Sequence, residues 1–376
     1  MRVAMLDPSG FSPSYTHRLC GGLAANGHEV TLFTTRSSPI DDPDRSYRRE
    51  DHFYRYTGTL GETRPAMRLA VKGLEHVWDI GRLVRTLQSW NPDVIHFQWF
   101  PLPVADQVIL RRLHRIAPVV HTVHDSDPYR GAASAWLQYL AAKHIRKQVT
   151  RLVVHTAYTR NRLIRDGIDP STVAIIPHGL LHLDGDVEEP RPEPTQSRIL
   201  FFGTLKPYKG LETLIRAFSM LPSAYRRDAT LHVVGRAMMD LAPLRSLARR
   251  EGVQQRIEWQ LGYLPEQSLG SILDRTTVLA LPYRHIDQSG VLITAVGAGI
   301  PVVATDVGGI PETITDGTHG YLVPPNDPPA FADALTRILE DSHRRARMAE
   351  AMRDLVREWP SWTAIGAETA NFYETL

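Results

Sequence analysis

Residues 184–197 read DGDVEEPRPEPTQS, and this stretch divides the chain into two parts. It contains three prolines, five acidic residues and almost no apolar side chain. Because such a composition cannot bury a hydrophobic core, we interpret the stretch as a linker between two domains. The length of 376 residues agrees with this, since it exceeds what one ordinary core requires. The sequence therefore predicts one domain over residues 1–183 and a second over residues 198–355.

On both sides of this linker, short apolar runs rich in branched residues alternate with longer amphipathic stretches. This alternation predicts an α/β fold in each domain, with a parallel sheet covered by helices on both faces. Ligands of such sheets bind beyond the carboxyl ends of the strands, so we expect the active site in a central cleft between the domains. The expected strands are residues 3–6, 30–34, 94–97, 119–123, 152–155, 199–202, 231–234, 257–259, 278–281, 302–304 and 321–323. The clearest expected helices are residues 15–26, 65–90, 159–166, 210–220, 241–251 and 328–340.

The composition narrows the class of protein. Hydrophobic residues make up 43% of the chain and charged residues 22%, as in soluble globular proteins. The single cysteine, Cys20, excludes an intramolecular disulfide and fits a reducing compartment. No apolar run reaches the roughly 18–20 residues needed to cross a bilayer. We therefore expect a cytoplasmic protein.

Basic side chains are distributed unevenly in the first domain. Residues 128–165 contain eight lysines and arginines but no Asp or Glu, and residues 65–90 add four more against Glu75 and Asp79. Such a surface suits an anionic acceptor or peripheral contact with an acidic membrane, and solvated helix faces are the alternative. Nucleic acid is not an expected partner, because neither interleaved aromatic residues nor a known reading motif accompanies these charges.

The strongest local motif is FGTLKPYKG at residues 202–210, directly after the first expected strand of the second domain. Gly203 would let the backbone approach a ligand closely, and the following helix would offer its N-terminus to an anion. Lys206 and Lys209 add positive charge in the same turn. The motif therefore predicts a phosphate or diphosphate site, and an exposed turn with solvated lysines is the alternative.

A second motif, DQSGV at residues 287–291, opens an apolar helix. Amide groups at a helix start suit phosphate oxygens, and Ser289 is placed to cap the helix. Asp287 and Gln288 are candidates for binding sugar hydroxyls. Helix capping alone is the alternative interpretation.

Two further stretches predict tight backbone paths beside strand ends. In TDVGGIPE, residues 305–312, paired glycines follow a strand and Pro311 suits the first turn of a short helix. In the first domain, DPSG at residues 7–10 follows the first strand, and Gly10 is a candidate for a similar backbone role.

The stretch HTVHDSD, residues 121–127, invites a metal interpretation. His121 and His124 lie three apart along an expected strand and would point to opposite faces, so we do not expect them to share an ion. A functional histidine at the strand end, His124, is the preferred interpretation. A structural histidine is the alternative.

Together these motifs resemble the family 4 retaining glycosyltransferases over essentially the whole chain. The resemblance implies the GT-B architecture, with two Rossmann-like domains facing a central cleft and a C-terminal helix, within residues 356–376, that crosses back to the first domain. The most specific stretch is GIPVVATDVGGIPE at residues 299–312. Supporting stretches, in order, are LAANGHEV (23–30), PDVIH (92–96), TVHD (122–125), IPHG (176–179), FGTLKPYKG (202–210) and LGY (261–263).

The resemblance also implies roles for individual residues. Lys209 contacts the diphosphate of a nucleotide-diphosphate sugar, Gly10 leaves room for it, and His124 lies at the donor sugar. The backbone of residues 289–291 (Ser289, Gly290, Val291) holds the phosphate or the sugar. Transfer retains the anomeric configuration by same-face attack, and positive side chains and helix N-termini stabilise the leaving group without a metal or other cofactor. The acceptor is a small molecule, a glycan or a lipid-linked compound.

The chain departs from the family pattern at the nucleotide contacts. Thr204 stands where the family has arginine, and Lys206 is the expected substitute. The two family glutamates, eight residues apart, fall on Ile286 and Thr294, and we expect Asp287 to replace the first of them. The candidate catalytic residues are therefore His124, Lys209 and Asp287. These departures leave open a transferase-like enzyme with an unusual donor, or a catalytically silent binding subunit of the same fold.

Overall fold

The computed structural model describes residues 1–38, 45–57, 65–127, 135–181, 196–262, 264 and 266–376. The chain forms two compact units, one of Met1–Gly179 with Pro360–Leu376 and one of Leu180–Trp359. The predicted domain boundaries, residues 183 and 355, lie a few residues from these. The predicted linker falls outside the described residues except for residues 196 and 197.

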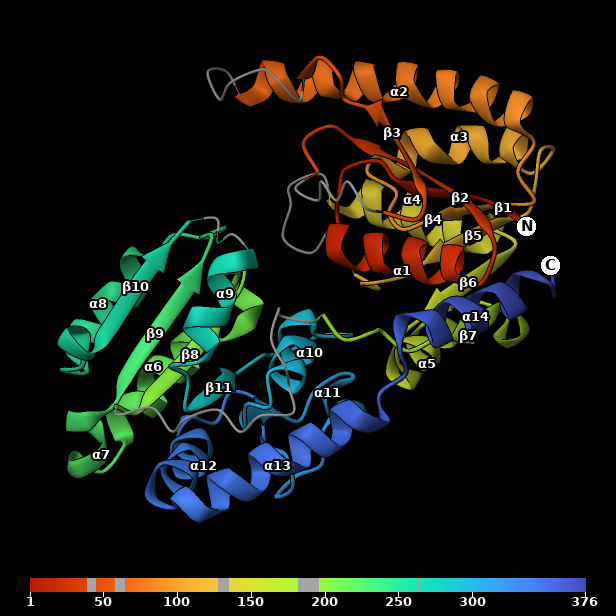
Figure 1. The fold of residues 1–376 in the computed structure, drawn as a ribbon. Coiled ribbons are helices and arrows are strands. Elements are labelled where there is room, and N and C mark those ends of the chain that lie inside the picture. Colours follow the sequence, from red (N-terminus) through yellow and green to blue (C-terminus); the bar gives the residue numbers. More distant parts are fainter. Residues whose placement is uncertain (39–44, 58–64, 128–134, 182–195, 263, 265) are drawn as a thin grey trace. The chain divides into compact units, whose positions relative to one another are not determined.

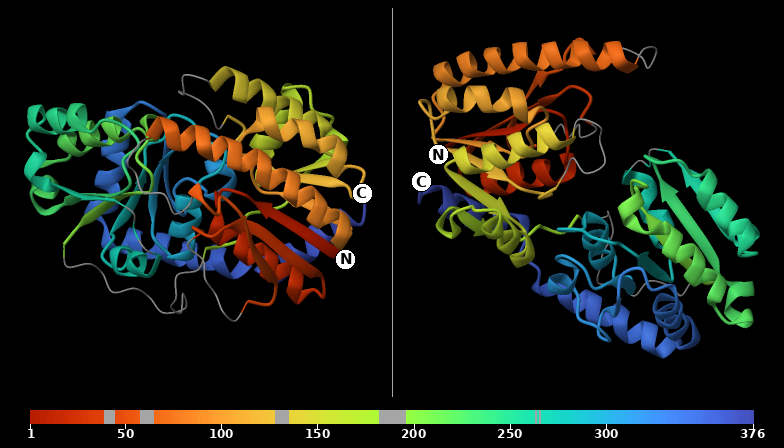
Figure 2. Two further views of the ribbon diagram at one scale, coloured as in Figure 1. Left: turned by 90° about the horizontal axis from the view of Figure 1, so that it is seen from above. Right: turned by 180° about the vertical axis from the view of Figure 1, so that it is seen from behind.

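The first unit is built on a parallel sheet of seven strands in the order β3-β2-β1-β4-β5-β6-β7. The helices lie in two layers, with α2, α3 and α4 on one face of the sheet and α1 with α14 on the other (Figures 1 and 2). The strands are β1 (Arg2–Asp7), β2 (Glu29–Thr35), β3 (Arg48–Phe53), β4 (Val94–Phe97), β5 (Val119–Thr122), β6 (Arg151–Val154) and β7 (Val173–Ile175). The helices are α1 (Pro13–Ala25), α2 (Pro65–Trp90), α3 (Pro103–Leu113), α4 (Ala135–Gln148), α5 (Ala157–Arg165) and α14 (Trp362–Tyr373).

The second unit repeats this plan with six parallel strands in the order β10-β9-β8-β11-β12-β13. One core contains residues of α6, α8 and α12, and the other contains residues of α9, α10 and α13. The strands are β8 (Arg198–Phe202), β9 (Thr230–Gly235), β10 (Ile257–Leu261), β11 (Val278–Leu281), β12 (Val302–Thr305) and β13 (Gly320–Val323). The helices are α6 (Leu211–Met220), α7 (Ser223–Asp228), α8 (Ala242–Arg250), α9 (Glu266–Leu273), α10 (Gly290–Gly297), α11 (Ile310–Thr313), α12 (Pro328–Glu340) and α13 (Ser342–Glu358).

Burial explains which strands the sequence reveals. Every residue of β9 and of β12 is buried, as expected for central strands covered by helices on both faces, so both strands are mostly apolar. The prediction missed β3 and β7, which form the two edges of the first sheet. The sequence of β3 is RREDHF and only its last two residues are buried, so it contains no apolar run.

The C-terminal helix α14 belongs to the first unit, where it packs on α1. The two helices cross at Gly22 and Gly366, and a Cβ added to Gly366 would lie 2.3 Å from the Gly22 carbonyl carbon. Side chains are therefore excluded at the crossing, and the backbones are in direct contact. Tyr373 anchors the last turn of α14 to the sheet, since its hydroxyl lies 2.5 Å from Nδ1 of His96 on β4. The predicted return of the chain to the first domain is confirmed.

Candidate active site

The predicted phosphate motif lies at the carboxyl end of β8. Gly203 follows the strand with φ of 105°, in the region that favours glycine. A Cβ at this position would lie 2.8 Å from Lys209 Nζ and 3.1 Å from Val291 Cγ2. Because Gly203 has no side chain, the Lys209 ammonium can occupy this space. For the same reason the stretch 202–210 can pack closely against the start of α10.

Lys209 is a buried cation of the second unit. Its side chain is only 7% exposed, and burial, reinforced by Lys206, lowers its pKa from 10.5 to about 8. Its Nζ lies 5.4 Å from the ring centre of buried Tyr283, within the range of a cation–π contact. No carboxylate among the described residues forms an ion pair with it. A buried cation in such surroundings is suited to an anionic ligand.

Helix α10 offers a second group for an anion. The side chain of Ser289 caps the helix as predicted, since its Oγ accepts a hydrogen bond of 3.1 Å from the Leu292 amide. Gly290 and Val291 lie in the first turn, where amides have no acceptor within the helix. Because Val291 also contacts the Gly203 position, these amides and the Lys209 ammonium belong to one site.

The remaining predicted residues of the second unit differ in accessibility. Thr204 and Lys206 are exposed, and Gln288 is half-buried. Asp287 is 5% exposed, and its backbone carbonyl accepts a hydrogen bond of 3.0 Å from the Gly309 amide. This hydrogen bond holds the stretch 305–312 against the stretch 287–291.

Thr294 is buried one turn into α10. Its hydroxyl donates a hydrogen bond of 2.9 Å to the carbonyl oxygen of Gly290, so the proton is used within the helix. Towards a ligand, the Thr294 hydroxyl oxygen can therefore only accept a hydrogen bond. A nucleotide contact at Thr294 stays a prediction.

In the first unit, Asp7 organises the loop that contains Gly10. Its carboxylate accepts hydrogen bonds from the amides of Phe11 (2.8 Å) and Ser12 (3.3 Å), and burial raises its pKa. Gly10 has φ of 61°, and an added Cβ would lie 3.5 Å from Ser38, so the constraint there is conformational rather than steric. Phe11 turns outward and stacks on Trp99 with ring centres 3.9 Å apart.

His124 lies just beyond β5, which ends at Thr122, and joins a chain of polar side chains. The Nδ1 of His155 lies 2.9 Å from the Ile176 carbonyl, which can only accept, so this nitrogen carries the proton. Burial lowers the pKa of His155 to about 4 and that of His124 well below 6.5, so both rings are neutral at pH 7. His124 Nδ1 lies 3.3 Å from His155 Nε2. The Nε2 of His124 lies 3.0 Å from Gln98 Oε1, which can only accept a hydrogen bond, and 3.3 Å from Ser12 Oγ.

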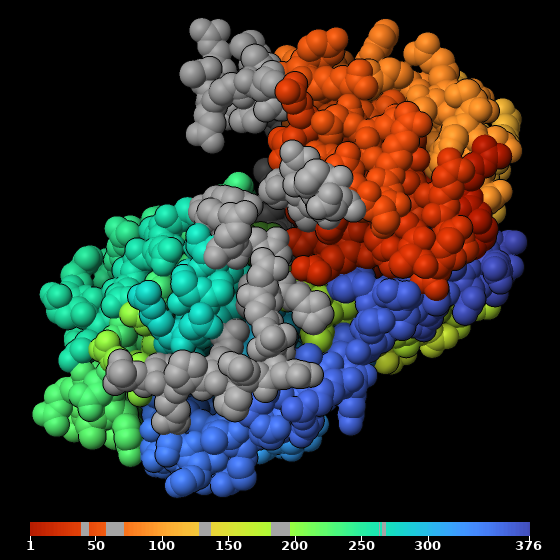
Figure 3. Space-filling view, in the orientation of Figure 1, coloured from red at the N-terminus to blue at the C-terminus, as the bar shows by residue number. Residues whose placement is uncertain are grey.

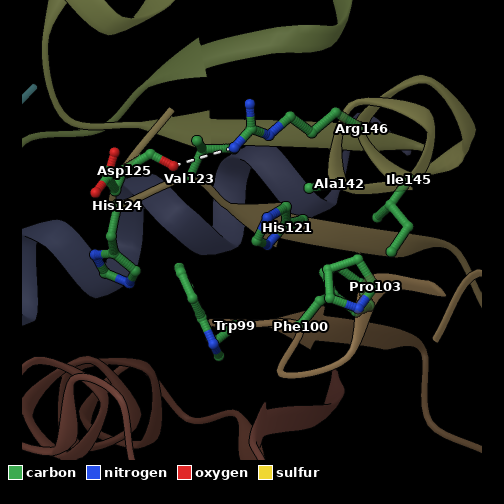
Figure 4. A pocket seen from close by; sticks show the side chains of 10 residues that line it. All are labelled: Trp99, Phe100, Pro103, His121, Val123, His124, Asp125, Ala142, Ile145 and Arg146. Atoms are coloured by element: carbon green, nitrogen blue, oxygen red, sulfur yellow. Dashed lines mark hydrogen bonds between the residues drawn. The ribbon is translucent and has the colours of Figure 1, made fainter. Parts of the chain in front are cut away.

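Figure 4 shows a small pocket beside this histidine. The guanidinium of Arg146 donates to the carbonyl oxygens of Ser126 (2.9 Å) and Asp125 (3.1 Å), which fixes the loop after β5. The His121 side chain forms a different hydrogen bond, from its Nδ1 to the Phe97 carbonyl oxygen at 3.1 Å. Among the described residues, no group of three His, Cys, Asp or Glu side chains could hold a metal ion. The pocket is lined by Trp99, Phe100, Pro103, His121, Val123, His124, Asp125, Ala142, Ile145 and Arg146.

The sequence had singled out Gly203, Lys209, Ser289, Gly290 and Val291, and the structure brings them together. Sequence reasoning missed Tyr283, Gln98 and His155, which reach the two sites from other strands. No local sequence motif marks these three residues, apart from their positions just after β11, β4 and β6.

Comparison with known proteins identifies the family. Residues 13–180 match the family described as Glycosyltransferase Family 4, and residues 196–341 match that described as Glycosyl transferases group 1. A D-inositol 3-phosphate glycosyltransferase of Corynebacterium diphtheriae is 30% identical over 305 residues, which cover 75% of this chain and 70% of that protein.

Solved structures share the fold over the full length. Sucrose-phosphate synthase from Thermosynechococcus elongatus superposes with a TM-score of 0.77 at 19% identity, covering 100% of this chain and 98% of that one. HepE of Anabaena, solved in complex with UDP-glucose, gives a TM-score of 0.73 at 18% identity and full coverage of both chains. Within the described residues, no helix is both long and apolar enough to cross a membrane. With both units matched in order and a relative at 30% identity, the chain belongs to the family 4 glycosyltransferases and has their GT-B fold.

Proposed function

We propose that this glycosyltransferase moves a sugar from a nucleotide-diphosphate sugar to an acceptor with retention of anomeric configuration. The observation that supports this most directly is the buried Lys209 ammonium, which lies over Gly203 beside the first turn of α10. A site of this kind suits a diphosphate better than a neutral ligand. The relative named for inositol 3-phosphate glycosylation and the HepE complex with UDP-glucose support the same donor class.

In this proposal, Lys209 and the α10 amides act on the leaving group. As the bond between the anomeric carbon and the phosphate oxygen breaks, that oxygen gains negative charge. A fixed ammonium and two amide donors stabilise this charge at the moment it develops. The acceptor hydroxyl attacks from the same face, and its proton passes to the departing phosphate oxygen. Positive side chains and amides supply the charge stabilisation, so we expect transfer to proceed in the presence of EDTA.

His124 has a separate role in the proposal. Because the His124 ring is neutral at pH 7, it can form a hydrogen bond with a sugar hydroxyl without bringing a charge to the site. It then positions the donor sugar and does not act as a general acid. Asp287 is proposed to take the place of the first family glutamate.

A transferase-like enzyme with an unusual donor is the second candidate. Thr294 favours it, because a buried hydroxyl bonded within the helix replaces the carboxylate that holds both ribose hydroxyls in the family. This candidate predicts weak binding of every common nucleotide and normal binding of a different phosphate ester.

The test is a thermal-shift titration with UDP, GDP, ADP, CDP and dTDP. A ligand that binds only the folded protein raises its melting temperature, so one nucleotide should give a clear shift. Lys209→Ala should abolish this shift, while Lys206→Ala, at an exposed position of the same turn, should only weaken it. A folded wild-type protein that responds to none of the five nucleotides would refute the main proposal and favour the unusual donor. Binding without sugar transfer to any acceptor in a panel would favour the silent subunit.

A further inference from the structure

The outward face of α2 is apolar where a surface helix is normally polar. Leu74 is 74% exposed and Trp78 67% exposed, and Val71 and Val77 lie on the same face. The opposite face of the helix packs into the core through Ile80, Leu83, Val84 and Leu87. The exposed apolar side chains are therefore not part of the buried core of the unit.

Helix α3 continues this apolar face at the same level. The buried pair His76 Nε2 and Asp106 Oδ1, 2.7 Å apart, aligns the middle of α2 with the first turn of α3. Val104 and Val108, 42% and 73% exposed, are therefore at about the same level on α3 as Leu74 and Trp78 on α2. In the space-filling view, α2 (orange) forms an outer surface of the unit (Figure 3).

Helix α4 extends the face further, since it packs against α3. Leu137 and Leu140 in its early turns are 49% and 52% exposed. All three helices run in the same direction, and each is apolar on its outer side in the earlier turns. We call the exposed set the apolar patch: Val71, Leu74, Val77, Trp78, Val104, Val108, Leu137 and Leu140.

The later turns of the same helices are basic on the outside. All three carboxylates in the described parts of these helices are turned inward: Glu75 is 9%, Asp79 2% and Asp106 1% exposed. The outer surface therefore has cations and no described carboxylate. Arg82 pairs with Asp79 at 3.5 Å, so we call the other cations the basic border: Arg85, Arg111, Arg112 and Lys147, with Arg115 just beyond α3.

The structure corrects the sequence-based view of this charge. Arg146, predicted on the basic surface, is 5% exposed and bonded to backbone carbonyls. Lys143 pairs with Asp166 at 2.9 Å, and Arg162 lies 3.5 Å from Asp127. The cations on the outer surface are thus those of the basic border, most of them outside the stretch 128–165.

We propose that the apolar patch and the basic border together bind the surface of an anionic lipid membrane. Exposed Trp, Leu and Val side chains enter the boundary between headgroups and acyl chains, and neighbouring arginines contact anionic headgroups. A second copy of the chain fits less well, because its identical face would bring more cations and no described carboxylate to pair with them. The proposal is independent of the donor site, since none of its residues belongs to the patch or the border.

The test is co-sedimentation of the full chain with vesicles of phosphatidylglycerol and phosphatidylcholine, compared with phosphatidylcholine alone. We expect binding only with the anionic lipid, weakened by salt. Leu74→Ser with Trp78→Ser should lower binding at least roughly tenfold, because apolar contact area is lost. Arg111→Glu with Arg112→Glu should do so as well, because each cation near an anionic surface contributes about a fivefold factor.

A matched control uses exposed apolar residues of the other unit. Met220 and Met238 are 51% and 52% exposed, and Met220→Ser with Met238→Ser should bind vesicles like wild type. Val104→Ser with Val108→Ser tests the same patch on a different helix, in case the α2 variant folds poorly. Equal vesicle binding by wild type and both patch variants would overturn the proposal. So would the absence of wild-type binding, or a wild-type dimer in sedimentation velocity that the patch variants convert to monomer.

Discussion

Replacing Lys209 by methionine should stabilise the unliganded protein while removing donor binding. The pKa of Lys209 falls from 10.5 to about 8 in the folded protein. Since one pKa unit corresponds to about 1.4 kcal/mol, the folded state carries a cost of about 3 kcal/mol for holding this charge. Methionine keeps a similar stem without the charge but loses the contact with the Tyr283 ring, about 1 kcal/mol. The net gain is about 2 kcal/mol.

The stability gain of Lys209→Met should become smaller as pH rises. Between about pH 8 and pH 10.5, the unfolded chain holds a proton on Lys209 that the folded protein has lost. Wild type therefore gains stability as pH rises through this window, and Lys209→Met does not. The advantage of the variant is full below pH 8 and disappears as pH approaches 10.5.

The measurement is scanning calorimetry of wild type and Lys209→Met at several pH values, without and with nucleotide. For a unit of this size, about 2 kcal/mol corresponds to roughly 4–8 °C in the transition of the second unit. Lys206→Met is the control, and its Tm should change little because the side chain is exposed. If Lys209→Met melts at or below wild type at pH 7, or keeps the same advantage at pH 10, the buried-charge reasoning is wrong.

Three further substitutions test single contacts. Gly203→Ala should weaken nucleotide binding at least roughly tenfold in titration calorimetry, because its Cβ would lie 2.8 Å from Lys209 Nζ at a φ of 105°. Gly366→Ala should destabilise the first unit by about 2 kcal/mol or more in urea unfolding, since its Cβ meets the α1 backbone at 2.3 Å, whereas Gly21→Ala, with open space, should be neutral or stabilising. Ser289→Ala should lower the free energy of unfolding by about 1 kcal/mol through loss of the α10 cap, and should also weaken nucleotide binding.

The fold was largely predictable because most strands of a parallel sheet are buried on both faces. β8 and β12 are short apolar runs for this reason, and the alternation with helices followed from them. The edge strand β3 escaped prediction because its solvent-facing residues are charged. The register of the strands and the crossing of α1 and α14 depend on contacts between residues far apart in the chain, which periodicity does not encode.

The site was predictable only where it is local. Gly203 and Lys209 lie within one turn, and Ser289 begins one helix, so short motifs could reveal them. Their surroundings were not predictable: Tyr283 reaches Lys209 from the segment just after β11, and the proton on His155 follows from the carbonyl of Ile176. Arg146 shows the converse error, because a basic residue counted on the surface proves to be buried.

At the carboxyl edge of the second sheet, packing fixes some positions of the proposed donor site and leaves others free to change. At Gly203 an added side chain would meet Lys209, and at Gly308 it would meet the Ile286 carbonyl oxygen at 1.5 Å, so packing fixes both positions. In the proposed site, the anion contacts would come from the Lys209 ammonium and from backbone amides, and the amides do not depend on side-chain identity. Thr204 is exposed, so its replacement costs the fold little. If the proposed site is correct, a change at such positions should alter which donor binds and leave phosphate binding in place, so the two should be separable by mutation.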